Sequence, residues 1–285
     1  MMKRAAVGLL LLLTGCATRH VLFDDFNYAS PDDLAKNGWI IRTEQGWPGI
    51  AGASWGRDSV SIANSILTMN AQTDGTTTRQ AQICQQRKFL EGTYAARVRF
   101  SDQPAIGPNG DQIVQSFYDI SPLKAPMDPD YSELDFEYLP NGGWGQTGST
   151  LWTTTWETFQ LEPWIADNIT KHQSGALGGW HTLVTQVGRS VVHYFLDGQP
   201  FAEHGGKYYP ESMMSINFNL WFVRDKLIPA TDLRQWTEDI DWVYFRGGRV
   251  QSPQDVEATI ADLRRRGMFF KDTVPSRGLT SPCNF

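Results

Sequence analysis

Alternation of apolar and polar residues is the feature that most constrains this chain. From about residue 58 to residue 245, short segments with a period of two are separated by Gly, Pro, Asn and Asp, and no helical pattern lies between them. The clearest segments are 94–100, 191–196, 215–222 and 240–245. Strands spaced in this way predict one all-β domain, an antiparallel sandwich or jelly roll.

One short helix is predicted near the C-terminus. Ser252 is a suitable N-cap, Pro253 suits the first helical position, and Asp255 stands three residues after the cap. Apolar residues then recur at helical spacing until a glycine ends the pattern. We expect the arginines 264–266 to form a solvated last turn that favours the helix dipole. A basic patch that binds anionic headgroups is the alternative.

The N-terminus has the pattern of an export signal. A charged start precedes an apolar run over residues 7–13, which is too short to cross a bilayer of about 30 Å as a helix. The tetrad Leu-Thr-Gly-Cys that ends at Cys16 is typical of the lipobox, where cleavage precedes a lipid-modified cysteine. We therefore expect lipidation at Cys16 and, with Ala17 next, anchoring to a bacterial outer membrane. A plain signal peptide with an incidental cysteine is the alternative.

Export bears on the two remaining cysteines, Cys84 and Cys283. They form an even pair in an oxidising compartment, so we predict a disulfide that ties the C-terminal tail to the body, with two free thiols as the alternative. The sequence contains no Cys-x-x-Cys, and its five histidines are scattered, so no zinc site is expected.

Charge and aromatic content narrow the classes of partner. The formal net charge is −6, which argues against nucleic acid as a partner, because nucleic acid binding requires a basic surface. Eleven Trp, nine Tyr and fifteen Phe are enough to build a large core and still line a groove.

The most informative strand is 131–139. Its alternation places Glu133, Asp135 and Glu137 on one face and apolar residues on the other. From spacing alone, a solvated acidic stripe, a calcium site and a catalytic trio all remain open.

Glycoside hydrolysis is one reaction that such a face could perform, because it needs one ionised and one protonated carboxyl group. In retaining enzymes the two groups lie about 5–5.5 Å apart. The Cα atoms of residues i and i+4 are about 13 Å apart on a flat strand, and side chains that lean together on a concave sheet shorten that distance. An acid between the two couples their titration and helps to keep one of them protonated.

At this motif the chain resembles glycoside hydrolase family 16, whose pattern Glu-x-Asp-x-Glu stands here at residues 133–137. Weaker matches follow in the same order as in the family, among them Phe23-Asp24-Asp25-Phe26, Gly92-x-Tyr94-x-x-Arg97 and Asn219-Leu220-Trp221. The resemblance implies a concanavalin A-like β-jelly roll over residues 22–246. It also implies Glu133 as the nucleophile, Asp135 as an assisting acid and Glu137 as the acid/base.

Further candidate residues surround this motif. Trp144, Trp152 and Trp156 follow the acids directly, and their flat indoles could stack on sugar rings or pack in the core. The resemblance adds Asn219 and Trp221 beside the cleft. Arg97 could orient a carboxylate or merely cover a sheet edge. Asp241 matches a residue that holds a structural calcium in some family members, so calcium is the one metal expected, and no cofactor is expected to be required.

These observations predict a lipid-anchored, monomeric, retaining endo-β-glycanase that acts on a β-linked polysaccharide. The expected organisation is a lipoprotein signal peptide (1–15), a short tether (16–21), the jelly roll (22–246) and a C-terminal helix and tail packed on it (247–285). The alternatives are a transglycosylase that remodels a cell-surface glycan and a catalytically idle carbohydrate-binding lipoprotein.

Overall fold

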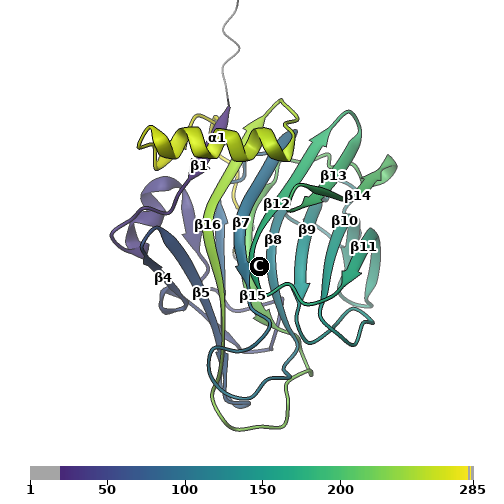
Figure 1. Ribbon diagram of the computed structural model, residues 1–285. Coiled ribbons are helices and arrows are strands. Elements are labelled where there is room, and N and C mark those ends of the chain that lie inside the picture. Colours follow the sequence, from purple (N-terminus) through teal and green to yellow (C-terminus); the bar gives the residue numbers. More distant parts are fainter. Residues whose placement is uncertain (1–19, 282, 284–285) are drawn as a thin grey trace, which may run out of the picture.

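The computed structural model describes residues 20–281 and residue 283. The predicted signal peptide, the lipidation site Cys16 and most of the tether lie outside the described residues. The described chain forms two packed β-sheets with one α-helix at one end (Figure 1). All strand pairs are antiparallel except one short parallel pair, so the predicted all-β sandwich is confirmed.

The first sheet, which we call the helix-covered sheet, carries α1 (Pro253–Arg265) on its outer face. Its strands run in the order β14 (Gln199–Gly205), β13 (Val191–Leu196), β12 (Gly179–Gly188), β7 (Gly92–Phe100) and β16 (Arg234–Gly247). Two strands pair with the other edge of β16: β1 (Val21–Asp24) and β5 (Ile66–Thr73). β1 also pairs with β17 (Phe270–Asp272), and β5 also pairs with β4 (Val60–Ala63).

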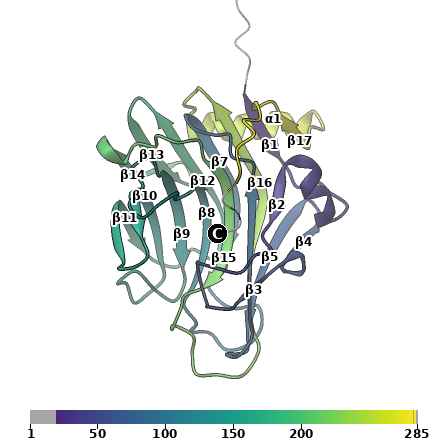
Figure 2. The ribbon, with the colours of Figure 1, turned by 180° about the vertical axis from the view of Figure 1, so that it is seen from behind.

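The second sheet, which we call the acidic sheet, carries the three acids of the Glu-x-Asp-x-Glu motif. Its strands run in the order β2 (Trp39–Ile41), β6 (Thr78–Gln85), β15 (Ser215–Phe222), β8 (Ile113–Ile120), β9 (Glu133–Leu139), β10 (Thr150–Gln160) and β11 (Ile165–Ser174). Figure 2 shows β15, β8, β9, β10 and β11 side by side. The start of β6 also pairs with β5 and with β3 (Ser54–Trp55), so β6 joins the two sheets.

The strand period decides which side chains fill the core between the sheets. On β9, Leu134, Phe136 and Tyr138 are at most 2% exposed and belong to the main hydrophobic cluster. The three acids alternate with them and therefore lie on the outer face of the acidic sheet. The sequence-based assignment of the two faces of this strand is thus confirmed. Short 3₁₀ helices complete the fold: η1 (Pro31–Asn37), η2 (Arg57–Ser59) and η3 (Gly206–Tyr208).

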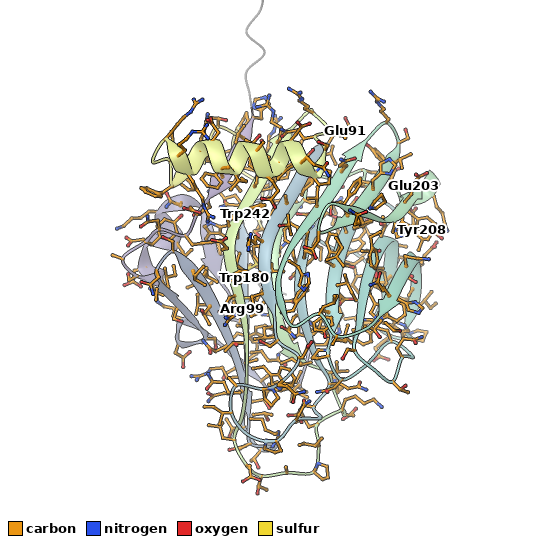
Figure 3. The ribbon with its side chains drawn as sticks, viewed as in Figure 1. Glu91, Arg99, Trp180, Glu203, Tyr208 and Trp242 are labelled. Atoms are coloured by element: carbon orange, nitrogen blue, oxygen red, sulfur yellow. A yellow bond between two sulfur atoms is a disulfide. The ribbon has the colours of Figure 1, made fainter. Side chains whose placement is uncertain are left out.

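The helix α1 begins as predicted, with the Ser252 hydroxyl accepting a hydrogen bond from the Asp255 backbone N–H at 3.1 Å. Its buried residues Val256 and Ile260 pack against Trp242 in the helix-covered sheet. Figure 3 shows Trp242 beneath the helix. Among the described residues, no helix is long and apolar enough to span a membrane.

The last turn of α1 differs in part from the prediction. Arg265 and Arg266 have side chains 71% and 72% exposed, as expected for a solvated turn. Arg264 differs from these two arginines, because its guanidinium binds Asp25 beside β1 and Asp241 in β16. This arginine therefore fastens the end of α1 to the sheet.

The C-terminal tail crosses from one sheet to the other. After β17 it reaches the edge of the acidic sheet, where the Ser281 hydroxyl donates to the Gln85 carbonyl at 3.1 Å. Cys283 is bonded to Cys84 in β6, 199 residues earlier. The structure therefore contains the predicted cysteine pairing, and the tail is tied to the body of the domain.

Candidate functional site

The three acids of β9 lie at the middle of the acidic sheet, with a strand on each side. Glu133 is opposite Ile120 of β8 and Trp156 of β10. Asp135 is opposite Tyr118 and Thr154, and Glu137 is opposite Ser116 and Trp152. Because directly opposed residues share a face, aromatic and small polar side chains flank the acids on the outer face of this sheet.

Each acid accepts a hydrogen bond from an uncharged aromatic donor. The Tyr131 hydroxyl donates to Glu133 at 2.5 Å, the Trp156 indole to Asp135 at 2.8 Å, and the Trp144 indole to Glu137 at 3.0 Å. These contacts orient three carboxyl groups without neutralising them. The three carboxyl groups on this face therefore still repel one another when they are ionised, as their spacing in the sequence implied.

Burial raises the pKa of all three carboxyl groups. The pKa of Asp135, which is 4% exposed and lies between the other two, is raised well above its usual range by burial and then by the charges of Glu133 and Glu137. Burial also raises the pKa of Glu133 to about 8 and that of Glu137 to about 7. Hence protons are retained on this face near neutral pH, and Asp135 is the site that holds one most firmly.

The hydrogen bonds distinguish the two glutamates more clearly than their pKa values do. Glu133 accepts from Tyr131 and from Asp135, and both contacts lower the pKa of Glu133 against the effect of burial. Glu137 accepts from the single indole of Trp144. Hydrogen bonds to a carboxylate favour its ionised form, so these contacts offset part of the effect of burial on Glu133. The pKa of Glu133, about 8, still lies above that of Glu137, about 7, so the hydrogen bonds and not the pKa order favour an anion at Glu133.

The acids form the floor of a depression that is open to solvent. Its lining comes from β8, β9, β15 and the loop after β2: Trp47, Pro48, Ser116, Tyr118, Ile120, Glu133, Asp135, Glu137, Asn219 and Trp221. Carboxyl groups and aromatic rings thus meet in one concave site, an arrangement typical of a catalytic or binding site.

Trp144 lies beside two residues of the lining, Glu137 and Trp221. Its side chain is 41% exposed, and its ring centroid is 6.0 Å from that of Trp221. Four consecutive residues, 142–145, have positive φ, and Trp144, with φ of 51°, is the one that is not glycine. A bulky residue in the left-handed region costs about 1–3 kcal/mol, and such strain concentrates at functional sites. The loop therefore aims an indole at Glu137.

Four other predicted binding residues lie on the same face with different exposure: Trp152, Trp156, Asn219 and Trp221. Trp156 binds Asp135, and the Asn219 side chain accepts from the Ser116 hydroxyl beside Trp221 on the lining. Trp152 is only 7% exposed, and its ring lies 4.4 Å from that of His172. Trp152 therefore supports the floor of the site more than it offers a surface to a ligand.

Arg97 lies elsewhere, so its predicted role beside the carboxylates is wrong. It belongs to β7 in the helix-covered sheet, where its guanidinium is 5.6 Å from the ring centroid of Trp180 and 3.5 Å from Asp241. Figure 3 shows Trp180 and neighbouring Arg99 on the outer face of that sheet, below α1. The alternative interpretation, that Arg97 covers the sheet, agrees with the structure.

The predicted calcium ligand Asp241 is paired with arginine side chains. Its carboxylate accepts from Arg264 at 2.5 Å and 3.3 Å and is 3.5 Å from Arg97. Among the residues that the structure describes, no group of three or more acidic, His or Cys side chains could hold a metal ion. The donor set at Asp241 therefore does not fit calcium, because a guanidinium already occupies its carboxylate.

Two aromatic residues of the lining were not predicted from the sequence. Trp47 lies in a loop far from the motif along the chain, yet its ring is 5.7 Å from that of Phe159 in β10, so the loop reaches over the acidic sheet. Tyr118 is opposite Asp135, and its hydroxyl accepts from Gln82, which in turn accepts from the buried Arg42 at 2.9 Å. The period of the 113–120 strand could have identified Tyr118, whereas no local pattern identifies Trp47.

Comparison with solved structures defines the class of fold. A β-glucanase from Bacillus licheniformis has a TM-score of 0.58 at 14% identity, over 79% of this chain and 97% of that one. A laminarinase from Flavobacterium sp. UMI-01 has a TM-score of 0.57 at 16% identity, over 79% of this chain and 98% of that one. A κ-carrageenase from Pseudoalteromonas carrageenovora has a TM-score of 0.55 at 12% identity, over 84% of this chain and 99% of that one.

At these identities the likeness shows the fold, which is the β-jelly-roll sandwich of these enzymes. No family model matches the sequence, and no curated protein matches it.

Proposed function

We propose that this protein is a retaining endo-β-glycanase that hydrolyses a β-linked polysaccharide. The observation that carries the proposal is the row of three buried carboxyl groups on the floor of an aromatic-lined depression, with a protonated Asp135 between two glutamates. Glycoside hydrolysis needs one anionic and one protonated carboxyl group on the same face. Three interacting carboxyl groups with raised pKa values can hold and release protons around neutral pH.

Glu133 acts as the nucleophile. Its carboxylate attacks the anomeric carbon while Glu137 donates a proton to the glycosidic oxygen, so that the bond to the leaving sugar breaks and a glycosyl ester forms on Glu133. Glu137, now ionised, takes a proton from water, whose oxygen attacks the same carbon and releases the sugar from Glu133. The hydrogen bond from Asp135 stabilises the Glu133 anion before attack and as it leaves.

The substrate class is proposed from the neighbours and from the lining. Two of the structural neighbours reported above bear the names β-glucanase and laminarinase. Exposed indoles at Trp47 and Trp144, 39% and 41% exposed, offer flat surfaces on which sugar rings can stack. We therefore propose a β-glucan or a related β-linked glycan, cut within the chain by a monomeric enzyme that requires no cofactor.

We also propose that the protein is exported and attached to the bacterial outer membrane by lipid on Cys16. The lipobox tetrad and the short apolar run before it support this location. The Cys84–Cys283 disulfide is consistent with an oxidising compartment.

The experiment that tests the activity is a screen of the purified protein on a panel of polysaccharides. The panel contains mixed-linkage β-glucan, β-1,3-glucan, xyloglucan and galactan, and new reducing ends are measured, with Glu133→Gln as the inactive control. NMR during the first turnovers should show the β-anomer as the initial product, which defines retention. Products longer than the substrate would indicate transglycosylation. Binding without cleavage by the wild type would leave a carbohydrate-binding protein and contradict the proposal.

A further inference from the structure

We propose that the end of the sandwich where the chain enters the fold is a membrane-contact face that binds anionic phospholipid headgroups. We call it the entry face and define it by six exposed residues at the two ends of α1: Arg249, Val250, Arg265, Arg266, Met268 and Phe269. The inference rests in part on the lipid anchor proposed above, and its test is independent of that anchor and of the enzymatic activity.

The path of the chain brings the anchor to this face. The His20 carbonyl accepts from the Gly247 N–H at 2.9 Å, and the Val21 N–H donates to the Thr273 hydroxyl at 2.9 Å. The chain therefore enters the fold between the end of β16 and the residue after β17. Cys16 precedes His20 by four residues, which span at most about 14 Å when fully extended. A lipid on Cys16 would hold this end of the molecule, and no other, close to the bilayer.

The two ends of α1 carry the same chemistry. At one end, in the turn between β16 and α1, the exposed Arg249 stands next to Val250, which is 45% exposed. At the other end, the exposed Arg265 and Arg266 precede Met268 and Phe269, which are 38% and 47% exposed. Exposed arginines beside exposed apolar side chains are typical of surfaces that bind phosphate headgroups and insert apolar groups among them.

The helix sets these two groups apart on one surface. Its 13 residues span about 20 Å at 1.5 Å per residue, and it lies across the end of the sandwich (Figure 1). Two contacts at this separation, together with the chain entry, can define the orientation of a rigid domain on a planar surface. A single contact would let the domain rotate about its tether.

Nearby acids offset part of the positive charge of the entry face, and one of them, the exposed Asp255, lies in the first turn of α1, at the same end of the helix as Arg249. Asp262 binds both Arg265 and Arg266, which leaves one net positive charge in that group. Glu257 is turned toward β12, where it accepts from the Thr182 hydroxyl at 2.7 Å. Without residues 1–15 the chain has 23 basic and 31 acidic residues, so most of its surface repels an anionic membrane. Exposed arginines on the entry face therefore give the protein a preferred side toward such a membrane.

This orientation has a consequence for the site on β9. The strands of both sheets extend between the end that carries α1 and the opposite end of the sandwich (Figures 1 and 2). The acids lie on the outer face of the acidic sheet, which α1 does not cover. With the entry face on the bilayer, the depression opens sideways. A long glycan lying along the membrane could then reach it.

The test uses the chain from Ala17 onward, which keeps every residue of the fold and lacks the lipid. Flotation with vesicles of phosphatidylethanolamine and phosphatidylglycerol (3:1) should show binding at low salt that weakens as salt is added, and phosphatidylcholine vesicles should bind little protein. The variant Arg249→Glu/Arg266→Glu should bind the anionic vesicles at least about tenfold more weakly, since each basic residue near the surface contributes about 1 kcal/mol. Phe269→Ser should weaken binding by a smaller factor.

The matched controls lie in the loop between β15 and β16, at the opposite end of the strands. Arg224→Glu/Lys226→Glu changes the net charge by the same amount, and Leu233→Ser removes a side chain that is 44% exposed. Both controls should bind like the wild type. Equal weakening by the two charge reversals, absence of binding to anionic vesicles, or a dimer that Phe269→Ser dissociates would overturn the proposal. Mass spectrometry of the N-terminal peptide from the full chain tests lipidation of Cys16 separately.

Discussion

Two strands of this sandwich, β9 and β16, carry acids at alternate positions, and the surroundings of the two sets differ. On β16, Asp239 is 2.7 Å from Arg99 and accepts from the Thr68 hydroxyl at 2.6 Å, and Asp241 binds Arg264. On β9, the three acids accept from a phenol and two indoles and are buried together.

The difference shows that the pattern of acids by itself does not identify a reactive site. Asp239 and Asp241 each lie beside a guanidinium group that compensates the charge of the carboxylate, and such pairs stabilise the fold. The acids of β9 lower the stability of the folded state at neutral pH, because burial raises their pKa values and they repel one another. Lack of compensation is not sufficient either, because Glu238 of β16 is also buried without a hydrogen-bond partner among the described residues. The acids of β9 differ from Glu238 in that they line a depression that is open to solvent.

The largest expected effect separates the two strands by activity. Glu133→Gln should reduce kcat/KM on the polysaccharide found in the screen by at least about a thousandfold, because the amide cannot form the glycosyl ester. Asp239→Asn should keep activity within about threefold of the wild type, because its contacts lie on the other sheet. Comparable losses of kcat/KM in the two variants would contradict the proposal that the reaction takes place at the acids of β9.

The next effect distinguishes the two glutamates of β9. Glu137→Ala should reduce kcat/KM on the natural glycan by about 10²–10⁴-fold, the usual contribution of a general acid. On an aryl glycoside with an acidic phenol as leaving group the loss should be far smaller, because that group departs without a proton. Measuring both substrates with the same preparation checks this. An equal loss on the two would show that Glu137 does not protonate the leaving group.

A smaller effect concerns the paired acids beside α1. Arg264→Gln should lower the Tm by about 4–8 °C, because it leaves Asp25, which is 4% exposed, without its cationic partner, at about 2 kcal/mol. Activity measured well below the Tm should be unchanged. Addition of EDTA to the wild type should leave the Tm where it is, because Arg264 rather than calcium neutralises Asp241. A clear fall in Tm with EDTA would restore the calcium interpretation.

The smallest expected effect concerns how the contribution of Asp135 to the stability of the folded state changes with pH. The pKa of Asp135 is far higher in the folded protein than in the unfolded chain, so the folded state keeps a proton that the unfolded state loses, and stability falls as pH rises through this interval. Asp135→Asn cannot lose that proton, so its Tm should exceed that of the wild type by a few degrees at pH 8 and match it near pH 4. Thermal unfolding at several pH values measures this difference, and Asp239→Asn should lower the Tm at pH 8.

Much of the fold could be predicted because its signals are local. The period of two on 131–139 correctly separated the acids from the core residues, and Ser252 caps the helix as expected. The disulfide partner of Cys84 follows from counting cysteines in a chain whose N-terminus has the pattern of an export signal. Each of these inferences uses residues on one element or a simple count.

The errors concern contacts between distant segments. The family pattern in its strand predicts Arg97 beside the acids, and the structure places it in the other sheet. Trp47 was overlooked because only the path of its loop brings it to Phe159. Arg264 was expected in solvent, and it binds two aspartates from elements far away in sequence.

The sequence by itself therefore determined which side chains share a face, where the helix begins and which three acids stand together. These features depend on the period of a strand and on hydrogen bonds between neighbouring residues. Only the tertiary structure decided which acids meet a guanidinium and which are buried beside aromatic rings. The physical reason is that burial and long-range pairing depend on how the two sheets pack, and packing is a property of the whole chain.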